Sequence, residues 1–415
     1  MPARRLLNQR CAKHLLSRSF PFPVGPRASW LVVALFITPL VIPLHAQQKT
    51  KLPRPRRLDE DLALRRDPAT GELTSTPAAG SAATNANKDA TSTRPIAVVT
   101  QIVPVMCNVV GADGAAVGGL QRDDFRVFDD GAPQSITYFD ASTESASVAL
   151  VLDASPSVLR ESDEMKNAAR ALVDALSSSD QTAVVDFSAH TYLQLPFSND
   201  WALIRKAVAR VDARALLGDV GGSNIYEAVF LTARELFANR TGRKAIVLLT
   251  DGQDSELGLT LDPATAGPRK GWPADRLTFE DVERTLATAD IQVFVVSTES
   301  RPKVMTADWV AAHASQTLLN YSVRDSGIPA YTLYLAELAQ RSGGQLYFLR
   351  EAETLADTFR QIALRIRAEY TLGFSPAANA TAAPHSGWHQ LRVAVIGHGD
   401  PTVVHRASYY VPAAR

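Results

Sequence analysis

Three short stretches of the sequence carry oxygen side chains that could bind a metal ion. In the first, an apolar run ends at Asp153, and two hydroxyl side chains, Ser155 and Ser157, follow at alternate positions. Ser223 follows two glycines and precedes a helical apolar pattern, and Asp251 directly follows another apolar run. Carboxylate and hydroxyl oxygens are the ligands that hard cations such as Mg²⁺ prefer. The stretches therefore predict a divalent-cation site, provided that the fold brings them together.

The surrounding pattern predicts a doubly wound, mainly parallel, Rossmann-like α/β sheet. Short apolar runs typical of strands buried on both faces alternate with helical periodicity. The predicted strands are 148–152, 183–187, 192–195, 245–249, 293–296 and 346–349, and the predicted helices are 165–176, 201–211, 225–237, 279–289, 331–341 and 355–368. In such a sheet the strand-to-helix loops meet at the carboxyl edge, where ligands bind. All five oxygen side chains can therefore converge at that edge.

Each stretch taken alone also has a purely structural interpretation. Ser155 and Ser157 could cap the next helix. Gly221-Gly222 could form only a turn, and Thr250-Asp251-Gly252 could only close a strand. Their joint occurrence, in order and at the ends of predicted strands, favours the metal site.

Together the three stretches resemble the metal-ion-dependent adhesion site of the von Willebrand factor type A domain. The motifs that carry the resemblance are Asp153-x-Ser155-x-Ser157, Gly-Gly-Ser223 opening a helix, and a buried strand ending in Thr250-Asp251-Gly252. The resemblance implies that Asp153, Ser155, Ser157, Ser223 and Asp251 hold Mg²⁺ (or Mn²⁺ or Ca²⁺). It also implies that an Asp or Glu carboxylate of a protein ligand completes the ion's coordination.

Ser223 departs from the family pattern, which usually has threonine at this position. Serine keeps the hydroxyl but lacks the methyl group that restrains χ1, so a less preorganised ligand is expected. Metal binding is expected, and this substitution leaves its affinity open.

The flanks of the α/β region, 95–144 and 369–415, are rich in predicted strands and turns, including Asp-Gly pairs that suit tight hairpins. The C-terminal flank has too few strands to fold alone, and the β-rich unit before the α/β region is its expected partner. We therefore expect a β-sandwich formed from both flanks, with a type A domain, 145–368, inserted between them. Motifs in the flanks are similar to an exported subgroup of type A proteins typical of Acidobacteria: Leu120-Gln-Arg-Asp-Asp-Phe125, Tyr370-Thr-Leu-Gly-Phe374 and Trp388-His-Gln-Leu-Arg-Val393.

The N-terminal region predicts an exported protein. Basic residues precede an apolar run that ends Leu44-His45-Ala46, as in a signal peptide spanning 1–46, although an uncleaved anchor remains the alternative. Residues 47–94 have few large apolar side chains and predict a disordered linker. The protein is then periplasmic, in the cell envelope or extracellular, with no stable membrane span after cleavage. Cys107 is the one cysteine of the mature chain, which excludes an intramolecular disulfide and a cysteine-based zinc site.

The composition and motifs favour a binding protein over an enzyme. The 43 basic and 43 acidic residues cancel, which gives no reason to propose a nucleic-acid partner. The sequence has no nucleophile elbow, P-loop, dinucleotide fingerprint or His-Glu-x-x-His helix. Four histidines of the last β region fit no metal-ligand spacing and are interpreted as exposed polar positions: His385, His389, His398 and His405.

Our first hypothesis is an exported, non-catalytic adhesion or scaffolding module that binds a protein through a divalent cation. The second is a structural envelope protein that assembles through a metal-independent type A domain. A hydrolase in which the ion activates water is a third, for which no base is evident. Two long segments, 253–277 and 298–330, should border the metal edge, and Trp272, Trp309 and Tyr321 in them are either contact aromatics or packing residues.

Overall fold

The computed structural model describes most of the chain beyond residue 50. The described residues are 51–60, 63–66, 73–76, 102–112, 117–141, 145–155, 158, 162–215, 222–254, 276–306, 309, 313, 318, 327–349, 355–367, 369–376, 387–399 and 401–411. The predicted signal peptide, Ser157, Trp272, Tyr321 and His385 lie outside them. None of the described helices has the length and apolar character needed to cross a membrane.

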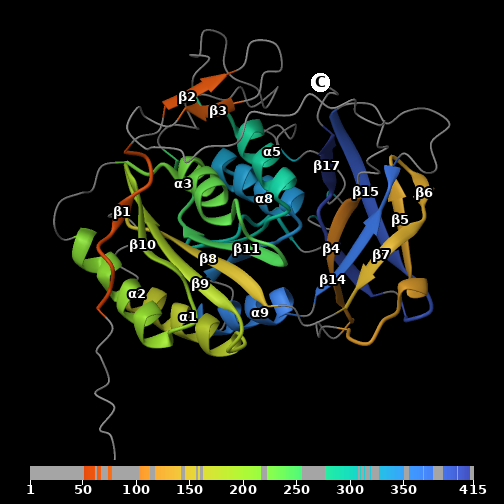
Figure 1. Ribbon diagram of the computed structural model, residues 1–415, viewed down its shortest axis with the longest axis horizontal. Helices are drawn as coiled ribbons and strands as arrows, with labels where there is room; N and C mark the ends of the chain where they lie inside the picture. The colour runs from red at the N-terminus through yellow and green to blue at the C-terminus, as the bar shows by residue number, and fades with distance from the viewer. Residues whose placement is uncertain are drawn as a thin grey trace, which may run out of the picture. The chain divides into compact units, whose positions relative to one another are not determined.

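A seven-stranded sheet forms the centre of the α/β region, in the order β1-β10-β9-β8-β11-β12-β13 (Figure 1). Its parallel strands are β8 (Ala146–Asp153), β9 (Gln181–Phe187), β11 (Arg243–Thr250), β12 (Gln292–Ser297) and β13 (Leu346–Phe348). The antiparallel strands are β10 (Thr191–Ser198) and β1 (Arg56–Arg57). The predicted doubly wound, mainly parallel sheet is confirmed.

Helices cover both faces of this sheet (Figure 1). One face carries α1 (Ser162–Ala175), α2 (Trp201–Ala215) and α9 (Leu355–Arg367). The other carries α3 (Ile225–Leu231), which continues as a π-helical turn over Thr232–Leu236, with α5 (Phe279–Ala289) and α8 (Ala330–Ser342). Alternate side chains of β8 enter the two cores, Leu150 and Leu152 on the first face and Ala149 and Val151 on the second. The continuous apolar run before Asp153 follows from this double burial.

Two further four-stranded antiparallel sheets form the predicted β-sandwich. The first has β16 (Thr402–His405), β4 (Val103–Val110), β14 (Glu369–Phe374) and β7 (Ile136–Asp140). The second has β17 (Ser408–Val411), β15 (Gly387–Val395), β5 (Phe125–Asp129) and β6 (Ala132–Gln134). Each sheet mixes strands from both flanks, and one core includes Val105, Phe125, Tyr370 and Val393. Two incomplete β units thus complete each other, as the strand count predicts.

The prediction of disorder for 47–94 is wrong for three described segments. β1 pairs with β10, with Arg56 opposite Leu193, and the backbone N–H of Leu58 donates to the Thr191 carbonyl at 2.8 Å. β2 (Ala63–Arg66) and β3 (Leu73–Thr76) form a hairpin. Leu58 and Leu73 are buried in the core of the α/β region. These segments need no core of their own, because β1 pairs with the edge of the sheet and Leu58 and Leu73 are buried in the core of the α/β region.

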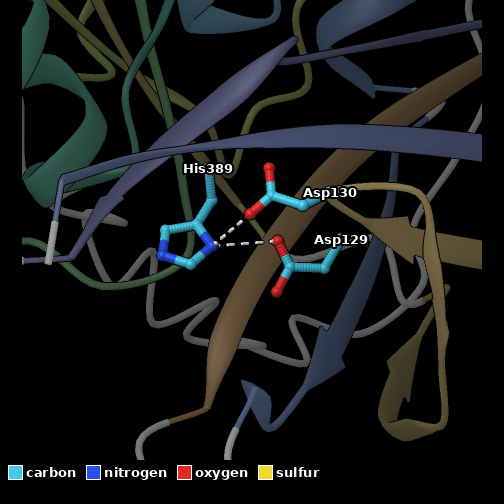
Figure 2. A group of neighbouring side chains, drawn as sticks. All are labelled: Asp129, Asp130 and His389. Atoms are coloured by element: carbon cyan, nitrogen blue, oxygen red, sulfur yellow. Dashed lines mark ion pairs between the residues drawn. The ribbon is translucent and has the colours of Figure 1, made fainter. Parts of the chain in front are cut away.

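The prediction that His389 is an exposed polar residue is also wrong. His389 is only 2% exposed and lies against Asp129 and Asp130 of the β5–β6 hairpin (Figure 2). His405 is partly buried, and its Nε2 accepts a hydrogen bond from the Val393 N–H at 3.1 Å. Burial lowers the pKa of His405 below its ordinary value. His398 alone of the described three is exposed.

Candidate metal site

Asp153 lies at the carboxyl end of β8, a strand enclosed by β9 on one side and β11 on the other. The chain leaves the sheet there, with the Ala154 N–H still donating to the Phe187 carbonyl at 2.8 Å. The Asp153 side chain is fully buried. Burial of a carboxylate without compensating partners costs free energy, so the contacts of Asp153 indicate the function of the site.

Three neighbouring groups donate to the Asp153 carboxylate. The Ser155 N–H donates to Oδ1 at 2.9 Å. The Ser223 hydroxyl and the Thr250 hydroxyl both donate to Oδ2, at 3.3 and 2.7 Å. Donor groups from three separate segments of the chain therefore surround one carboxylate at the sheet edge.

Asp251 follows β11 directly and is 5% exposed. Its Oδ1 accepts a hydrogen bond from the Gln253 N–H at 3.0 Å, which fixes the turn. Gly252 between them has φ 89°, and an added Cβ would lie 2.8 Å from Leu335 Cδ1. This turn requires glycine both for its left-handed backbone and for its close approach to α8.

The electrostatics of the edge favour a bound cation. Burial raises the pKa of Asp153 to about 6, although hydrogen bonds from Thr250 and Ser155 oppose the rise and the negative charge of Asp251 adds to it. Two carboxylates with neutral hydroxyls around them form a set of hard, negatively charged oxygen donors. Such a set fits Mg²⁺ or another hard divalent cation.

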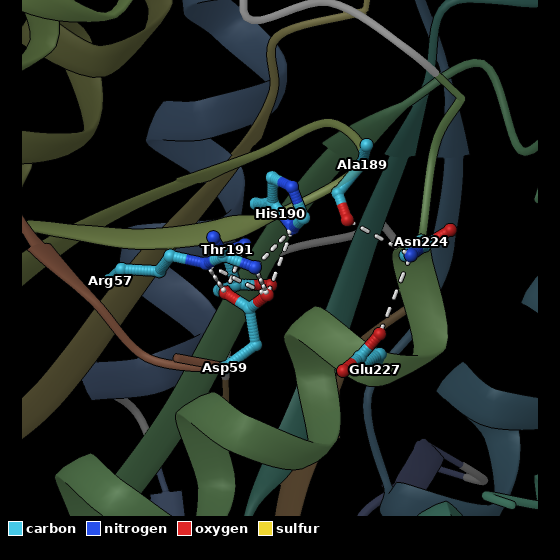
Figure 3. A network of polar contacts seen from close by, with 7 residues as sticks. All are labelled: Arg57, Asp59, Ala189, His190, Thr191, Asn224 and Glu227. Carbon is cyan, nitrogen blue, oxygen red and sulfur yellow. Dashed lines mark hydrogen bonds and ion pairs between the residues drawn. The ribbon is translucent and has the colours of Figure 1, made fainter. Parts of the chain in front are cut away.

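Ser223 is positioned by its neighbour Asn224, which is tied to the turn between β9 and β10 (Figure 3). The Asn224 N–H donates to the Ser188 carbonyl at 2.9 Å, and its side-chain amide donates to the Ala189 carbonyl at 3.1 Å. The same amide donates to Glu227 Oε2 at 3.4 Å. Asn224 thus links the start of α3 to this turn.

The β9–β10 turn is itself held by the N-terminal segment that contains strand β1 (Figure 3). Asp59 Oδ2 lies 2.8 Å from Arg57 Nη2 and 2.9 Å from His190 Nδ1, and Oδ1 accepts from the Thr191 N–H at 3.2 Å. Burial opposes ionisation of Asp59, but the hydrogen bonds from Arg57 and Thr191 hold its pKa below the ordinary value. A chain of polar contacts therefore leads from the segment before the sandwich to the loop that carries Ser223.

The structure brings together four of the five predicted ligand residues: Asp153, Ser155, Ser223 and Asp251 lie at one edge of the sheet. Ser157 is outside the described residues. Thr250 was predicted only as part of a turn, yet its hydroxyl both donates to Asp153 and accepts from the Gly252 N–H at 3.0 Å. The signal that identifies it is the parallel register, because Leu249 pairs with Leu152 and the next residues of the two strands are Thr250 and Asp153.

Trp309 is the candidate contact aromatic that the structure describes. It is partly buried, packs against the apolar core, and stacks on His313 with ring centroids 4.2 Å apart. Of the two interpretations of this residue, packing beneath a long segment agrees better with its surroundings.

Three solved structures of low sequence identity are similar to part of this chain. An aerotolerance-related membrane protein from Bacteroides fragilis is 18% identical (TM-score 0.36), covering 54% of this chain and 98% of that chain. The proximal thread matrix protein 1 of the mussel byssus, with a zinc-occupied MIDAS motif, is 16% identical (TM-score 0.37), covering 56% and 48%. The von Willebrand factor domain of the Porphyromonas gingivalis pilus tip protein Mfa5 is 12% identical (TM-score 0.35), covering 54% and 95%.

Two comparisons used the sequence alone. No curated protein matches the chain. Residues 148–253, which contain Asp153, Ser223 and Asp251, match the family model of the von Willebrand factor type A domain.

Proposed function

We propose that this protein is an exported, non-catalytic binding module that holds a protein partner through a divalent cation. Asp153, Ser155, Ser157, Ser223 and Asp251 would hold the ion, Mg²⁺ or else Mn²⁺ or Ca²⁺. A bound ion supplies a positive charge with an open coordination position, which suits an Asp or Glu carboxylate of the partner. Adhesion and scaffolding are the roles that such a site serves.

The observation that carries this proposal is the buried Asp153 carboxylate, which accepts a hydrogen bond from the Ser223 hydroxyl at 3.3 Å. The two residues are far apart in the sequence and meet at the carboxyl edge of the sheet, beside Asp251. Two buried carboxylates close to each other repel when both are ionised, and a cation bound between them removes that repulsion. The match of 148–253 to the type A family model supports the same conclusion.

The remaining features of the proposal rest on the sequence. The signal-like segment 1–46 supports export to the periplasm, cell envelope or exterior. We also propose domain limits at 95–144, 145–368 and 369–415, and the positions of the described strands and helices support this division. We propose membership of the exported subgroup typical of Acidobacteria on the flank motifs alone.

Calorimetric titration with Mg²⁺ and Mn²⁺ tests the metal site. We expect one ion to bind the unaltered protein and no ion to bind Asp153→Ala. Asp163→Ala, on α1, is a matched control because its side chain is 95% exposed and lies outside the site. Absence of binding to the unaltered protein contradicts the proposal and leaves a metal-independent envelope protein as the better hypothesis. Equal binding to Asp153→Ala would place the ion elsewhere.

A second experiment tests the partner. Capture from envelope extract should depend on the divalent ion, be lost with EDTA, and be lost with Asp153→Ala but not Asp163→Ala. Capture that persists with EDTA contradicts the role of the cation.

A further inference from the structure

Two carboxylates of the β-sandwich, outside the α/β region that holds the site above, converge on a single imidazole nitrogen (Figure 2). His389 Nδ1 lies 3.3 Å from Asp129 Oδ1 and 2.9 Å from Asp130 Oδ2. The three ligand atoms all lie within 4.8 Å of one another. This group joins the N-terminal flank, through the β5–β6 hairpin, to β15 of the C-terminal flank.

The backbone places these side chains with little freedom. Asp130 and Gly131 have φ of 47° and 82°, the left-handed values of a tight two-residue hairpin turn. The Asp130 N–H donates to the Gln390 carbonyl at 2.9 Å, which ties the turn to β15. Asp129 pairs with Leu391 in the same sheet. The carboxylates therefore come from a turn that is anchored on both sides.

Each carboxylate has one oxygen held by an outer donor and the other directed at His389. Tyr409 Oη donates to Asp129 Oδ2 at 2.9 Å, and the Gln390 N–H donates to Asp130 Oδ1 at 2.8 Å. Burial and the negative charge of Asp129 raise the pKa of Tyr409, so its hydroxyl remains a donor. Asp129 Oδ1 is buried and has no hydrogen-bond partner among the described residues, its contact with His389 being an ion pair only. Outer donors that orient carboxylates in this way are typical of metal sites.

A proton explains the arrangement less well than a metal ion. Nδ1 can carry one proton, and when that proton bonds to Asp130, the nearer carboxylate, Oδ1 of the buried Asp129 is left without a hydrogen bond. Ligands about 2.0–2.1 Å from an ion, in tetrahedral or octahedral geometry, lie roughly 2.9–3.4 Å apart. The two measured separations from Nδ1 fall in that interval.

Charge and chemistry identify the class of ion. Two carboxylates and a neutral imidazole balance a dication, and an imidazole nitrogen suits Zn²⁺ better than Mg²⁺ or Ca²⁺. The side chains of His389 and Asp129 are 3% and 9% exposed, whereas that of Asp130 is 40% exposed and gives the site its opening to solvent.

We propose that Asp129, Asp130 and His389 form a second metal site that binds Zn²⁺ and fastens the two flanks of the β-sandwich together. It is independent of the site at Asp153, which has oxygen ligands and lies in the α/β region. Water completes the coordination on the side of Asp130.

The test uses Zn²⁺ and the purified Asp153→Ala protein, so that the first site makes no contribution. We expect calorimetry to show one Zn²⁺ per chain, and Co²⁺ to give the visible absorption of an ion bound to nitrogen and oxygen. Adding Asp130→Asn should weaken Zn²⁺ binding at least tenfold. Asparagine tolerates the left-handed backbone of residue 130 and keeps the oxygen that accepts from Gln390, so this variant is expected to fold. Circular dichroism checks that it does.

His398→Ala is the matched control, because His398 faces a single carboxylate, Asp124, at 3.3 Å on the same sandwich. It should leave Zn²⁺ binding unchanged. Zn²⁺ should also raise the unfolding temperature of Asp153→Ala but not that of Asp153→Ala with Asp130→Asn. The proposal is overturned if Asp153→Ala binds no Zn²⁺, if Asp130→Asn binds it equally well, or if His398→Ala removes the binding.

Discussion

The Ser223 hydroxyl donates to Asp153 Oδ2, as the Thr250 hydroxyl does, and it is also a candidate ligand in its own right. We expect Ser223→Ala to weaken Mg²⁺ binding about tenfold, since an oxygen ligand is lost. The free energy of unfolding without metal should change by no more than about 1.5 kcal/mol, because Thr250 still donates to the carboxylate. Calorimetry and urea denaturation measure the two effects.

Ser223→Thr is the informative companion variant. Threonine keeps the hydroxyl and adds the methyl group that restrains χ1. Binding should match or exceed that of the unaltered protein. Equal affinity of Ser223→Ala and the unaltered protein would show that residue 223 is not a ligand.

At the scale of elements, α5 and α8 pack around an unbalanced set of buried charges. Arg341 Nε lies 3.1 Å from Glu283 Oε1 and also contacts Glu337, so one guanidinium faces two buried carboxylates. Burial raises the pKa of Glu283 to about 8; the charge of Arg341 opposes this rise and that of Glu337 adds to it. Glu283 is therefore protonated in the native state at neutral pH.

This raised pKa predicts how stability depends on pH. Below the ordinary pKa of 4.5 Glu283 is protonated in both the native and the unfolded state, so keeping it neutral in the native state costs no stability. Between pH 4.5 and about pH 8 the unfolded state releases this proton and the native state keeps it. The free energy of unfolding therefore falls as pH rises, by at most about 1.4 kcal/mol per pH unit. Glu283→Gln should remove this decline, as measured by urea denaturation between roughly pH 5 and pH 8. Glu280→Gln, on the same helix but 47% exposed, should retain it. The same slope in both variants would contradict the assignment.

Strand β1 provides a second prediction at this scale, because Asp59 links it to the turn that holds Asn224. Asp59→Ala removes the contacts with Arg57, His190 and the Thr191 N–H, at a cost of about 1–3 kcal/mol. Hydrogen exchange should accelerate at Leu58 and Asn224, and Mg²⁺ affinity should fall. Glu60→Ala, one residue further on and exposed, is the control. Exchange at Asn224 that stays unchanged in Asp59→Ala would show that β1 does not support the site.

The sequence predicts a helix or strand well where its own hydrophobic periodicity determines it. It predicts an element less well where a neighbouring strand determines it. The helix predicted at 279–289 has the same bounds as α5, and Thr278 and Asp281 form its capping box. β1 was missed because its short polar sequence becomes a strand only beside β10. The roles of Thr250 and His389 depend on register and on pairing between distant segments, which no local pattern contains. The candidate site can be predicted from the sequence because Asp153 and Asp251 stand at the ends of neighbouring parallel strands, whose shared edge is fixed by topology.

For the whole molecule, the order of strands in the sandwich determines which parts of the chain depend on each other. β4 lies between β14 and β16, and β5 lies between β6 and β15. A chain ending at residue 367 therefore leaves β4 with no neighbour in its sheet and β5 with only β6. Val105, Phe125 and Val127, each at most 1% exposed, would lose the other half of their core.

We expect this truncated chain to bind a hydrophobic dye and to be cleaved by protease within 102–141, because a two-stranded remnant cannot form a stable sheet. The central strands β8 and β11 lose no partner in the truncation, so the Asp153 edge should still bind Mg²⁺, provided the α/β region folds. Limited proteolysis with mass spectrometry, beside the full chain, locates the cleavage. Protection of 102–141 in the truncated chain would show that the N-terminal flank folds alone and that the sandwich is not a shared unit.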